Sequence, residues 1–387
     1  MPLSRELVGF AAGGTLQQLE DSDLMGATEL TSTNLDATDL TDAWSNTGCP
    51  NGTRIEGDSE GEPRSRRTAR RDSSAVLFFA HLYAHARPGP SGHDRLPRPY
   101  RLTVRAASFG GMRFGIDVAQ QRMAFDEVVA RVRFGEELGF DGAWGFDHYV
   151  PMYGEGPGEC FEGMTTLAAL ATATSRIRLG LLVTGVTYRH PSVLAAQAIT
   201  VDHASHGRLE LALGAAWFEA EHRQLGIEFP PVGERFDRLE DTLEILVLLS
   251  TGDVVSYKGH HFTLTEASLR PVPVQRPHPP IWIGGSGLRR TLPLAARYAD
   301  VWHTYGSPEK LAELSVRLDR LADEAGRDPA AIGRASSLSL SEPDAEVRAN
   351  IERLADAGFG YLVCGWPSEG RSRVEAFAAT VMVDYPD

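Results

Sequence analysis

The feature that most constrains the fold is an alternation of short apolar segments with longer amphipathic ones, which starts at Met112 and continues towards the end of the chain. The apolar segments have the length of buried strands and the amphipathic ones have helical spacing, so we predict alternating strands and helices. Eight strands are expected, at residues 113–118, 142–146, 177–184, 209–214, 280–284, 300–304, 335–340 and 361–364.

Helices are expected between these strands, and glycines mark several of their ends. The helical segments are residues 124–138, 164–175, 193–204, 235–249, 288–298, 308–325 and 346–357. Gly139, Gly326 and Gly358 each follow the last apolar residue of a segment, where a left-handed cap favours glycine. The pattern is therefore typical of repeated strand–helix units.

Eight such units within residues 112–387 match an α/β fold of the (β/α)8 TIM-barrel type, which takes roughly 250 residues. A doubly wound sheet fits less well, because no GxGxxG fingerprint follows the first strand. Residues 251–280 exceed a normal loop, and their segments 254–257 and 261–264 predict a small hairpin inserted before the fifth strand.

Residues 1–111 have a different composition and are expected to be a disordered extension of the barrel domain at 112–387. Leu30, Leu35 and Leu40 recur every five residues like a pentapeptide repeat, but one coil is too short for a stable solenoid. Arg66-Arg67, followed by an apolar stretch, resembles a twin-arginine export signal that lies far from the N-terminus.

A third interpretation accounts for both features of this extension. The chain has only two lysines, Lys258 and Lys310, among 38 basic residues, which is typical of a GC-rich genome in which reading frames are easily extended. We therefore favour a natural protein that starts at Met112, with export through Arg66 and Arg67 as the alternative.

Charge and cysteine usage exclude several classes of protein. A net charge of −14 disfavours binding to nucleic acid or to acidic lipid surfaces. The three cysteines include no CxxC pair, and no apolar run reaches the length of a membrane span, so we expect a cytoplasmic protein. His203 and His206 have metal-like spacing but lack a third ligand, and no metal is assigned.

In a TIM barrel the active site lies at the C-terminal ends of the strands. Asp147 and His148 follow the second strand there, and a carboxylate beside an imidazole suits proton transfer. Residues 284–287 (GGSG) follow the fifth strand, where backbone N–H groups can hold an anion. Both stretches also have a simpler interpretation, as a loop cap and as a tight turn.

Several strand ends, taken together, resemble the bacterial-luciferase-like flavin and deazaflavin superfamily, particularly its coenzyme F420-dependent branch. The stretches that carry this resemblance are residues 188–191 (YRHP), 202–217 (DHASHGRLELALGAAW) with 219–222, and 283–287 with 296–300. The resemblance covers nearly all of residues 112–387 and none of the extension. It implies a cofactor, coenzyme F420 or alternatively FMN, and a small-molecule substrate.

The resemblance also implies roles for individual residues. His148 would donate or accept a proton beside the cofactor ring, oriented by Asp147, and Gly185-Val186 would form a non-prolyl cis peptide that supports the ring. Residues 285–287 would hold the ribityl phosphate. The residues expected to bind the cofactor are Thr184, Gly185, Val186, Gly214, Trp217, Glu221, Gly284, Gly285, Ser286 and Gly287. Trp217 has the alternative interpretation of a core or lid aromatic.

The chain departs from the family pattern at three positions, and three functions are considered. Ala216 replaces a usual glycine, and Phe218 and His303 each replace a usual asparagine. The leading hypothesis is an F420-dependent oxidoreductase that transfers a hydride to or from a small organic substrate. The alternatives are an FMN-dependent monooxygenase that uses a flavin hydroperoxide, and a non-catalytic cofactor-binding homologue. The resemblance also leaves a homodimer open, and the substrate is not readable.

Overall fold

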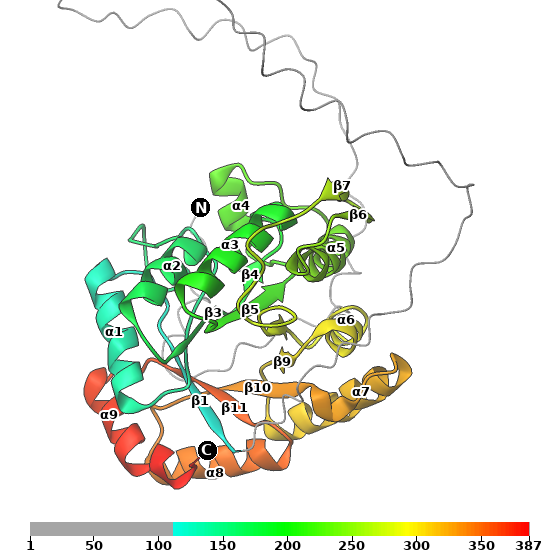
Figure 1. Ribbon diagram of the computed structural model, residues 1–387. Helices are drawn as coiled ribbons and strands as arrows, with labels where there is room; N and C mark the ends of the chain where they lie inside the picture. The colour runs from blue at the N-terminus through cyan, green and yellow to red at the C-terminus, as the bar shows by residue number, and fades with distance from the viewer. Residues whose placement is uncertain (1–110, 387) are drawn as a thin grey trace, which may run out of the picture. The chain divides into compact units, whose positions relative to one another are not determined.

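The structure is a computed structural model that describes residues 111–386 (Figure 1). The features noted around Leu30 to Leu40 and at Arg66-Arg67 lie outside the described residues.

A closed parallel barrel forms the centre of the fold, as the alternating pattern predicts. The strands pair in the order β3-β2-β1-β11-β10-β9-β8-β5-β4, and β3 also pairs with β5 through Leu179 and Leu209, which closes the ring. They are β1 (Arg113–Asp117), β2 (Gly142–Gly145), β3 (Arg178–Leu181), β4 (Thr184–Gly185), β5 (Leu209–Gly214), β8 (Ile281–Gly284), β9 (Val301–His303), β10 (Gly333–Leu338) and β11 (Tyr361–Gly365). The prediction of a (β/α)8 barrel is confirmed.

Helices surround this barrel (Figure 1). They are α1 (Phe125–Leu138), α2 (Gly163–Ala173), α3 (Pro191–Ala204), α4 (Glu219–Leu225), α5 (Val232–Ser250), α6 (Thr291–Tyr298), α7 (Pro308–Glu324), α8 (Asp344–Asp356) and α9 (Arg371–Thr380). The predicted helices are all present, with ends that shift by up to three residues, and Gly139, Gly326 and Gly358 have the expected positive φ. Neither α4 nor α9 was predicted; they are short, at seven and ten residues.

The predicted third strand, residues 177–184, is interrupted in the structure. β3 ends at Leu181, the peptide between Leu182 and Val183 is cis, and the chain resumes as β4. The expected cis peptide at Gly185-Val186 is therefore wrong by three residues. There the backbone follows β5 instead, because Gly185 is in register with Gly214 and the N–H of Val186 donates to the Gly214 carbonyl at 3.2 Å.

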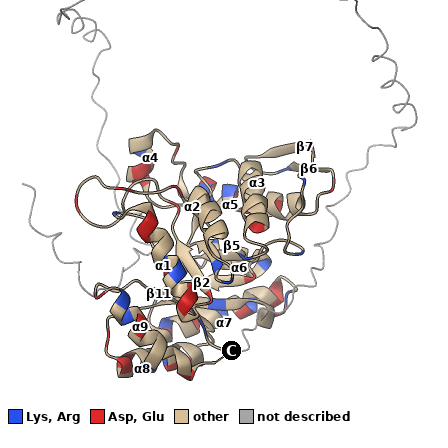
Figure 2. Cartoon of the chain, turned by 60° about the vertical axis from the view of Figure 1, so that its left-hand side comes forward, with Lys and Arg blue, Asp and Glu red and all other residues tan. Residues whose placement is uncertain are grey.

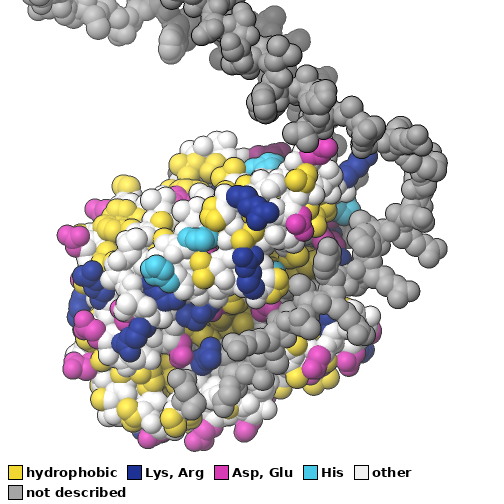
Figure 3. All heavy atoms as spheres, viewed as in Figure 1, with side chains coloured by type: hydrophobic (Ala, Val, Ile, Leu, Met, Phe, Trp, Pro, Cys, Tyr) yellow, Lys and Arg dark blue, Asp and Glu magenta, His cyan; other side chains and the backbone are white. Residues whose placement is uncertain are grey.

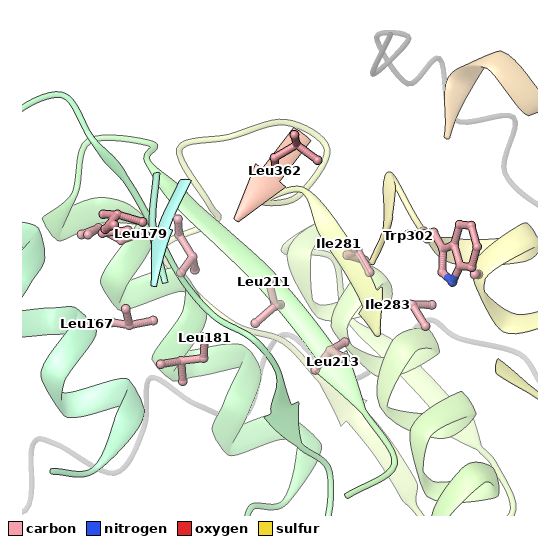
Figure 4. Close-up of a cluster of buried hydrophobic side chains, with 14 of the residues drawn as sticks. Leu167, Leu179, Leu181, Leu211, Leu213, Ile281, Ile283, Trp302 and Leu362 are labelled. Carbon is pink, nitrogen blue, oxygen red and sulfur yellow. The ribbon is translucent and has the colours of Figure 1, made fainter. Parts of the chain in front are cut away.

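The core has two layers, one on each side of the strands. Between strands and helices lies an aliphatic layer that includes Leu179, Leu211, Ile283 and Leu362 (Figure 4). The barrel interior holds a second cluster: Trp144, Ala212, Trp282, Val301, Ala335, Tyr361 and Val363. The large aromatic side chains of this cluster fill the interior. Any opening therefore lies at the C-terminal mouth, where the strands end in small residues.

The predicted insertion before the fifth barrel strand is an antiparallel hairpin of β6 (Val255–Lys258) and β7 (Thr263–Ala267). Asp241 of α5 fixes its turn by accepting hydrogen bonds from the N–H groups of His260 at 3.0 Å and His261 at 2.7 Å. The hairpin is therefore attached to the outer helical layer.

Charged residues lie on the helices and loops that surround the sheet (Figure 2). On the face seen in Figure 3, basic, acidic and apolar side chains are interspersed. Within the described residues, we find no helix with both the length and the apolar character that crossing a membrane requires.

Candidate active site

Glu221 and His148 form the central contact at the barrel mouth. The Nδ1 atom of His148, in the loop after β2, lies 2.9 Å from Oε2 of Glu221, near the start of α4. The N–H of Val150 donates to the other carboxylate oxygen at 3.0 Å, and that of Tyr149 also donates to it. One buried carboxylate thus fixes both the imidazole and the backbone that follows it.

The environment of Glu221 keeps its carboxylate ionised. Burial opposes ionisation, but the hydrogen bonds from His148, Tyr188 and two backbone N–H groups outweigh it and lower the pKa of Glu221 to about 2. With Nδ1 facing a permanent anion, the second nitrogen of the His148 ring is the one available for proton exchange.

Tyr188 is the other side chain that holds this carboxylate. Its hydroxyl donates to Oε2 of Glu221, and its ring stacks on His222 with centroids 4.7 Å apart. His222 is in turn fixed at both nitrogens, by Thr187 Oγ1 at 2.7 Å and by the Phe218 carbonyl at 2.8 Å. Because these partners are themselves immobilised, the carboxylate has little freedom to leave the histidine.

Asp147 lies in a separate network and does not contact His148. Its carboxylate accepts two hydrogen bonds from Arg189, at 2.6 and 2.7 Å, and one from the N–H of Gly185 at 3.0 Å. Arg189 also pairs with Glu162 at the start of α2. The expectation that Asp147 orients His148 is therefore wrong: Asp147 pairs with Arg189, whereas the partner of His148 is Glu221. Asp147 instead ties the β2 and β4 loops together.

Aromatic rings surround the His148 imidazole. The ring centroids of Phe146, Phe218 and Trp217 lie 5.4, 5.7 and 6.0 Å from it. Trp217 stacks on Phe218 and has 63% of its surface exposed, so in this structure it covers the site rather than the core. Phe218, which replaces an expected asparagine, contributes an apolar wall here.

Glycines at the strand ends bring the backbone close to the interrupted third strand. A Cβ atom at Gly214 or at Gly284 would lie 2.6 or 2.8 Å from the side chain of Val183. A larger residue at either position would displace this valine, whose side chain fills the space beside both glycines; Thr184 and Val186 nearby are buried.

The GGSG stretch forms a turn before α6 rather than its first residues. Gly285 has a φ of +118°, which favours glycine, and its N–H donates to the His303 carbonyl at 2.9 Å. The N–H of Leu292 donates to the Gly287 carbonyl at 3.0 Å, and α6 starts without a side-chain cap. The turn and the uncapped helix start remain compatible with holding a phosphate, with Ser286 between the two glycines.

No group of three or more potential metal ligands occurs among residues 111–386. His203 uses its Nε2 to contact the Val272 carbonyl at 2.8 Å, which attaches the inserted segment to α3. Within this part of the chain, Cys160 and Cys364 are free thiols.

Sequence reasoning missed several residues of the site. Glu162 was not singled out, because it precedes α2 rather than directly following a strand, and His222 was noticed only within residues 219–222. Tyr188 and Arg189 were noticed only within a motif, and their partners could not be assigned from it.

The family model for luciferase-like monooxygenases matches residues 107–378 of the chain. Among curated proteins, the chain is 30% identical over 226 residues to an F420-dependent hydroxymycolic acid dehydrogenase of Mycobacterium tuberculosis, which covers 58% of this chain and 61% of the relative. It is 27% identical over 252 residues to an FMNH2-dependent dimethylsulfone monooxygenase of Pseudomonas putida, with 65% and 68% covered.

Solved structures show the same fold at lower identity. An F420-dependent secondary alcohol dehydrogenase in complex with an F420-acetone adduct superposes with a TM-score of 0.64 at 19% identity, covering 70% of this chain and 98% of that one. A monooxygenase from Streptomyces bottropensis gives 0.61 at 21%, with 70% and 99% covered. The chain spans 61% and 64% of the length of the first two curated relatives. From the match to the family model over residues 107–378, the chain belongs to the luciferase-like monooxygenase family.

Proposed function

We propose that the protein is an F420-dependent oxidoreductase that transfers a hydride between the deazaflavin and a small organic substrate. The observation that carries this proposal is the hydrogen bond of 2.9 Å between the buried Glu221 carboxylate and Nδ1 of His148. It fixes one ring nitrogen and leaves the other for the proton that accompanies a hydride.

The proton transfer follows from this geometry. When a substrate alcohol is oxidised, the free nitrogen of His148 would take the hydroxyl proton, and coenzyme F420, when bound, would supply the hydride acceptor. Glu221 stabilises the imidazolium that forms, because its carboxylate is already ionised at neutral pH. In the reverse direction His148 would return the proton to the carbonyl oxygen.

The residues at the mouth fit a planar ring cofactor. Val183 packs against Gly214 and Gly284 at the strand ends, and the phenyl ring of Phe218 and the indole of Trp217 supply apolar walls near His148. The turn at Gly285 to Gly287 would hold the phosphate. Coenzyme F420, when bound, supplies a ring carbon that accepts or gives a hydride.

The relatives support two cofactors. Three of the curated relatives are F420-dependent, whereas the dimethylsulfone monooxygenase uses FMNH2 and matches a longer stretch of this chain. An FMN-dependent monooxygenase is therefore the second candidate. Both cofactors share the ring and the ribityl phosphate, so the turn before α6 does not distinguish them.

Cofactor binding separates the two candidates. We expect reduced F420 to bind tightly to the purified full-length protein in a fluorescence titration, and FMN to bind at least tenfold more weakly. Selective binding of FMN together with substrate-dependent oxygen uptake would establish the second candidate instead. Binding of F420 without turnover of any nitro, carbonyl or enoyl compound would support a non-catalytic homologue.

A further inference from the structure

A carboxyl group that the proposed proton transfer does not use lies at the end of β1, the strand next to β2. Asp117 is the last residue of β1, and Gly115, two residues earlier on the same face, approaches the interior rings of Trp144 and Tyr361. Side chains alternate along a strand, so Asp117 also faces the interior, one layer nearer the mouth.

The Asp117 carboxyl makes no hydrogen bond or salt bridge within residues 111–386. Burial raises its pKa to about 7. Burial is the largest cause of the raised pKa values of Tyr153 and Tyr305, and the charge of Asp117 is the second. Both phenols therefore lie near Asp117. Because Asp117 is only partly buried, solvent reaches this residue, and a ligand that enters the mouth can reach it too.

His303 of β9 presents a second polar group without a partner. The His303 side chain lies on the same face of β9 as that of Val301, which belongs to the interior cluster. Only 1% of the His303 surface is exposed. Its Nε2 atom is buried and has no hydrogen-bond partner. Burial lowers the pKa of His303 to about 3, so the ring is neutral, and Tyr305 packs edge-on against it at 4.9 Å.

The space beside Asp117 is open. Gly365 of β11 is in register with Asp117, and a Cβ atom built on it would meet no atom within 4 Å. Ser337 of β10 lies on the same face as the interior residue Ala335, yet it is exposed. The strands from β9 to β1 therefore border an opening with hydrogen-bonding groups at its edge.

We infer that Asp117 and His303, with Ser337 and Tyr305 beside them, form the substrate-binding half of the mouth and accept an uncharged group that carries a hydroxyl or carbonyl oxygen. The inference rests on the proposed function for the chemistry, and on these four residues for the substrate class. A neutral imidazole and a carboxyl group can each donate to or accept from such an oxygen.

The same groups disfavour an anionic substrate. A phosphate or carboxylate would face the Asp117 carboxyl, which is ionised above about pH 7, and the neutral His303 ring offers no charge to offset it. Tyr153 and Tyr305, which also face Asp117, add no positive charge. Arg122, on the loop after β1, donates to the Tyr153 carbonyl at 2.6 Å and to the carbonyl of Gly156, which occupies its guanidinium.

Ligand binding to the cofactor-free, full-length protein tests this inference without any need for turnover. The probes are three alcohols (2-propanol, cyclohexanol and 1-phenylethanol) and cyclohexanecarboxylate as the anion matched to cyclohexanol, at pH 8. Binding is followed by NMR of 15N-labelled histidine, with the His303 signal assigned through His303→Gln. At least one alcohol is expected to shift that signal, and cyclohexanecarboxylate to bind at least tenfold more weakly than cyclohexanol.

Two variants make the test specific. Asp117→Ala should weaken alcohol binding at least fivefold. Asp117→Asn should retain it and strengthen carboxylate binding about tenfold, because it removes the charge and keeps the hydrogen bond. Glu346→Gln, an exposed carboxyl change on α8, should alter neither. The inference is overturned if no alcohol binds, if the carboxylate binds as well as cyclohexanol to the unmodified protein, or if Asp117→Asn leaves the preference unchanged. Failure of F420 to bind would refute the proposed function alone.

Discussion

Glu221 accepts a hydrogen bond from Nδ1 of His148 at 2.9 Å, across 73 residues of sequence. The contact joins the loop after β2 to the helix after β5, and the backbone N–H groups that follow His148 use the same carboxylate. The orientation of the imidazole and the conformation of its loop therefore depend on one side chain from α4.

Replacing Glu221 should affect turnover more than folding. In Glu221→Gln the amide can still occupy the space, but it no longer stabilises a positively charged His148. We expect kcat/KM to fall about a hundredfold, a typical contribution of general acid–base catalysis. Glu219→Gln, an exposed change on the same helix, is the control and should stay near the unmodified value. A Glu221→Gln enzyme with undiminished kcat/KM would contradict the assignment.

The Glu221 carboxylate also predicts how the stability of the protein changes in acid. The pKa of Glu221 is lowered to about 2 in the folded chain against an ordinary value of 4.5. A lowered carboxyl pKa contributes stability that is complete above the unfolded value and is lost as pH falls towards 2. Urea unfolding between pH 5 and 3 should therefore show a shallower loss of stability in Glu221→Gln than in the unmodified chain. Parallel curves would argue against this pKa.

Asp147 and His148 should give opposite phenotypes despite being adjacent. The side chains of Asp147 and Arg189 are 1% and 7% exposed, so Asp147→Asn leaves a buried guanidinium with Glu162 as its other carboxylate. We expect a loss of about 3 kcal/mol in the free energy of unfolding. His148→Asn should instead abolish turnover at nearly unchanged stability.

An exposed aspartate provides the control for that comparison. Asp126→Asn, in the first turn of α1, should change stability by less than about 0.5 kcal/mol. If Asp147→Asn were as stable as this control and inactive, Asp147 would belong with the reacting groups rather than with the structural ion pair.

The barrel itself could be predicted from the sequence because its signal is local. The six residues from Leu209 to Gly214 are both the predicted strand and the observed β5. The partners at the site could not, since the contacts of Glu221 and Arg189 join segments tens of residues apart. The adjacency of Asp147 and His148 suggested a pair, but their side chains bind different partners, Arg189 and Glu221.

Ala216 is a second position that the family resemblance identified without indicating its backbone geometry. Ala216 was noted as a departure from a usual glycine, and the structure gives it a φ of +62°. A left-handed backbone costs an alanine roughly 1–2 kcal/mol, so the substitution is strained in a way that composition and periodicity do not reveal.

Restoring glycine at this position should therefore stabilise the protein. We expect Ala216→Gly to raise the free energy of unfolding by about 1 kcal/mol, the relief of strain less the greater chain entropy of glycine. Ala215→Gly is the matched control next to it; Ala215 has no positive φ and should lose about 0.5–1 kcal/mol on substitution. Chemical denaturation of the two variants decides the point, and equal effects would mean that residue 216 is unstrained in solution.

Deletion of residues 1–111 should leave the function of the barrel intact. β1 begins at Arg113 and is paired on both sides, with β2 and with β11, so the ring of strands closes within the described residues. A chain that starts at Met112 should retain cofactor affinity and turnover within about twofold of the full chain, equivalent to roughly 0.4 kcal/mol. Cofactor titration and a denaturant melt of both chains provide the measurement. A tenfold loss of affinity, or a chain that does not fold, would show that the first 111 residues contribute to the barrel.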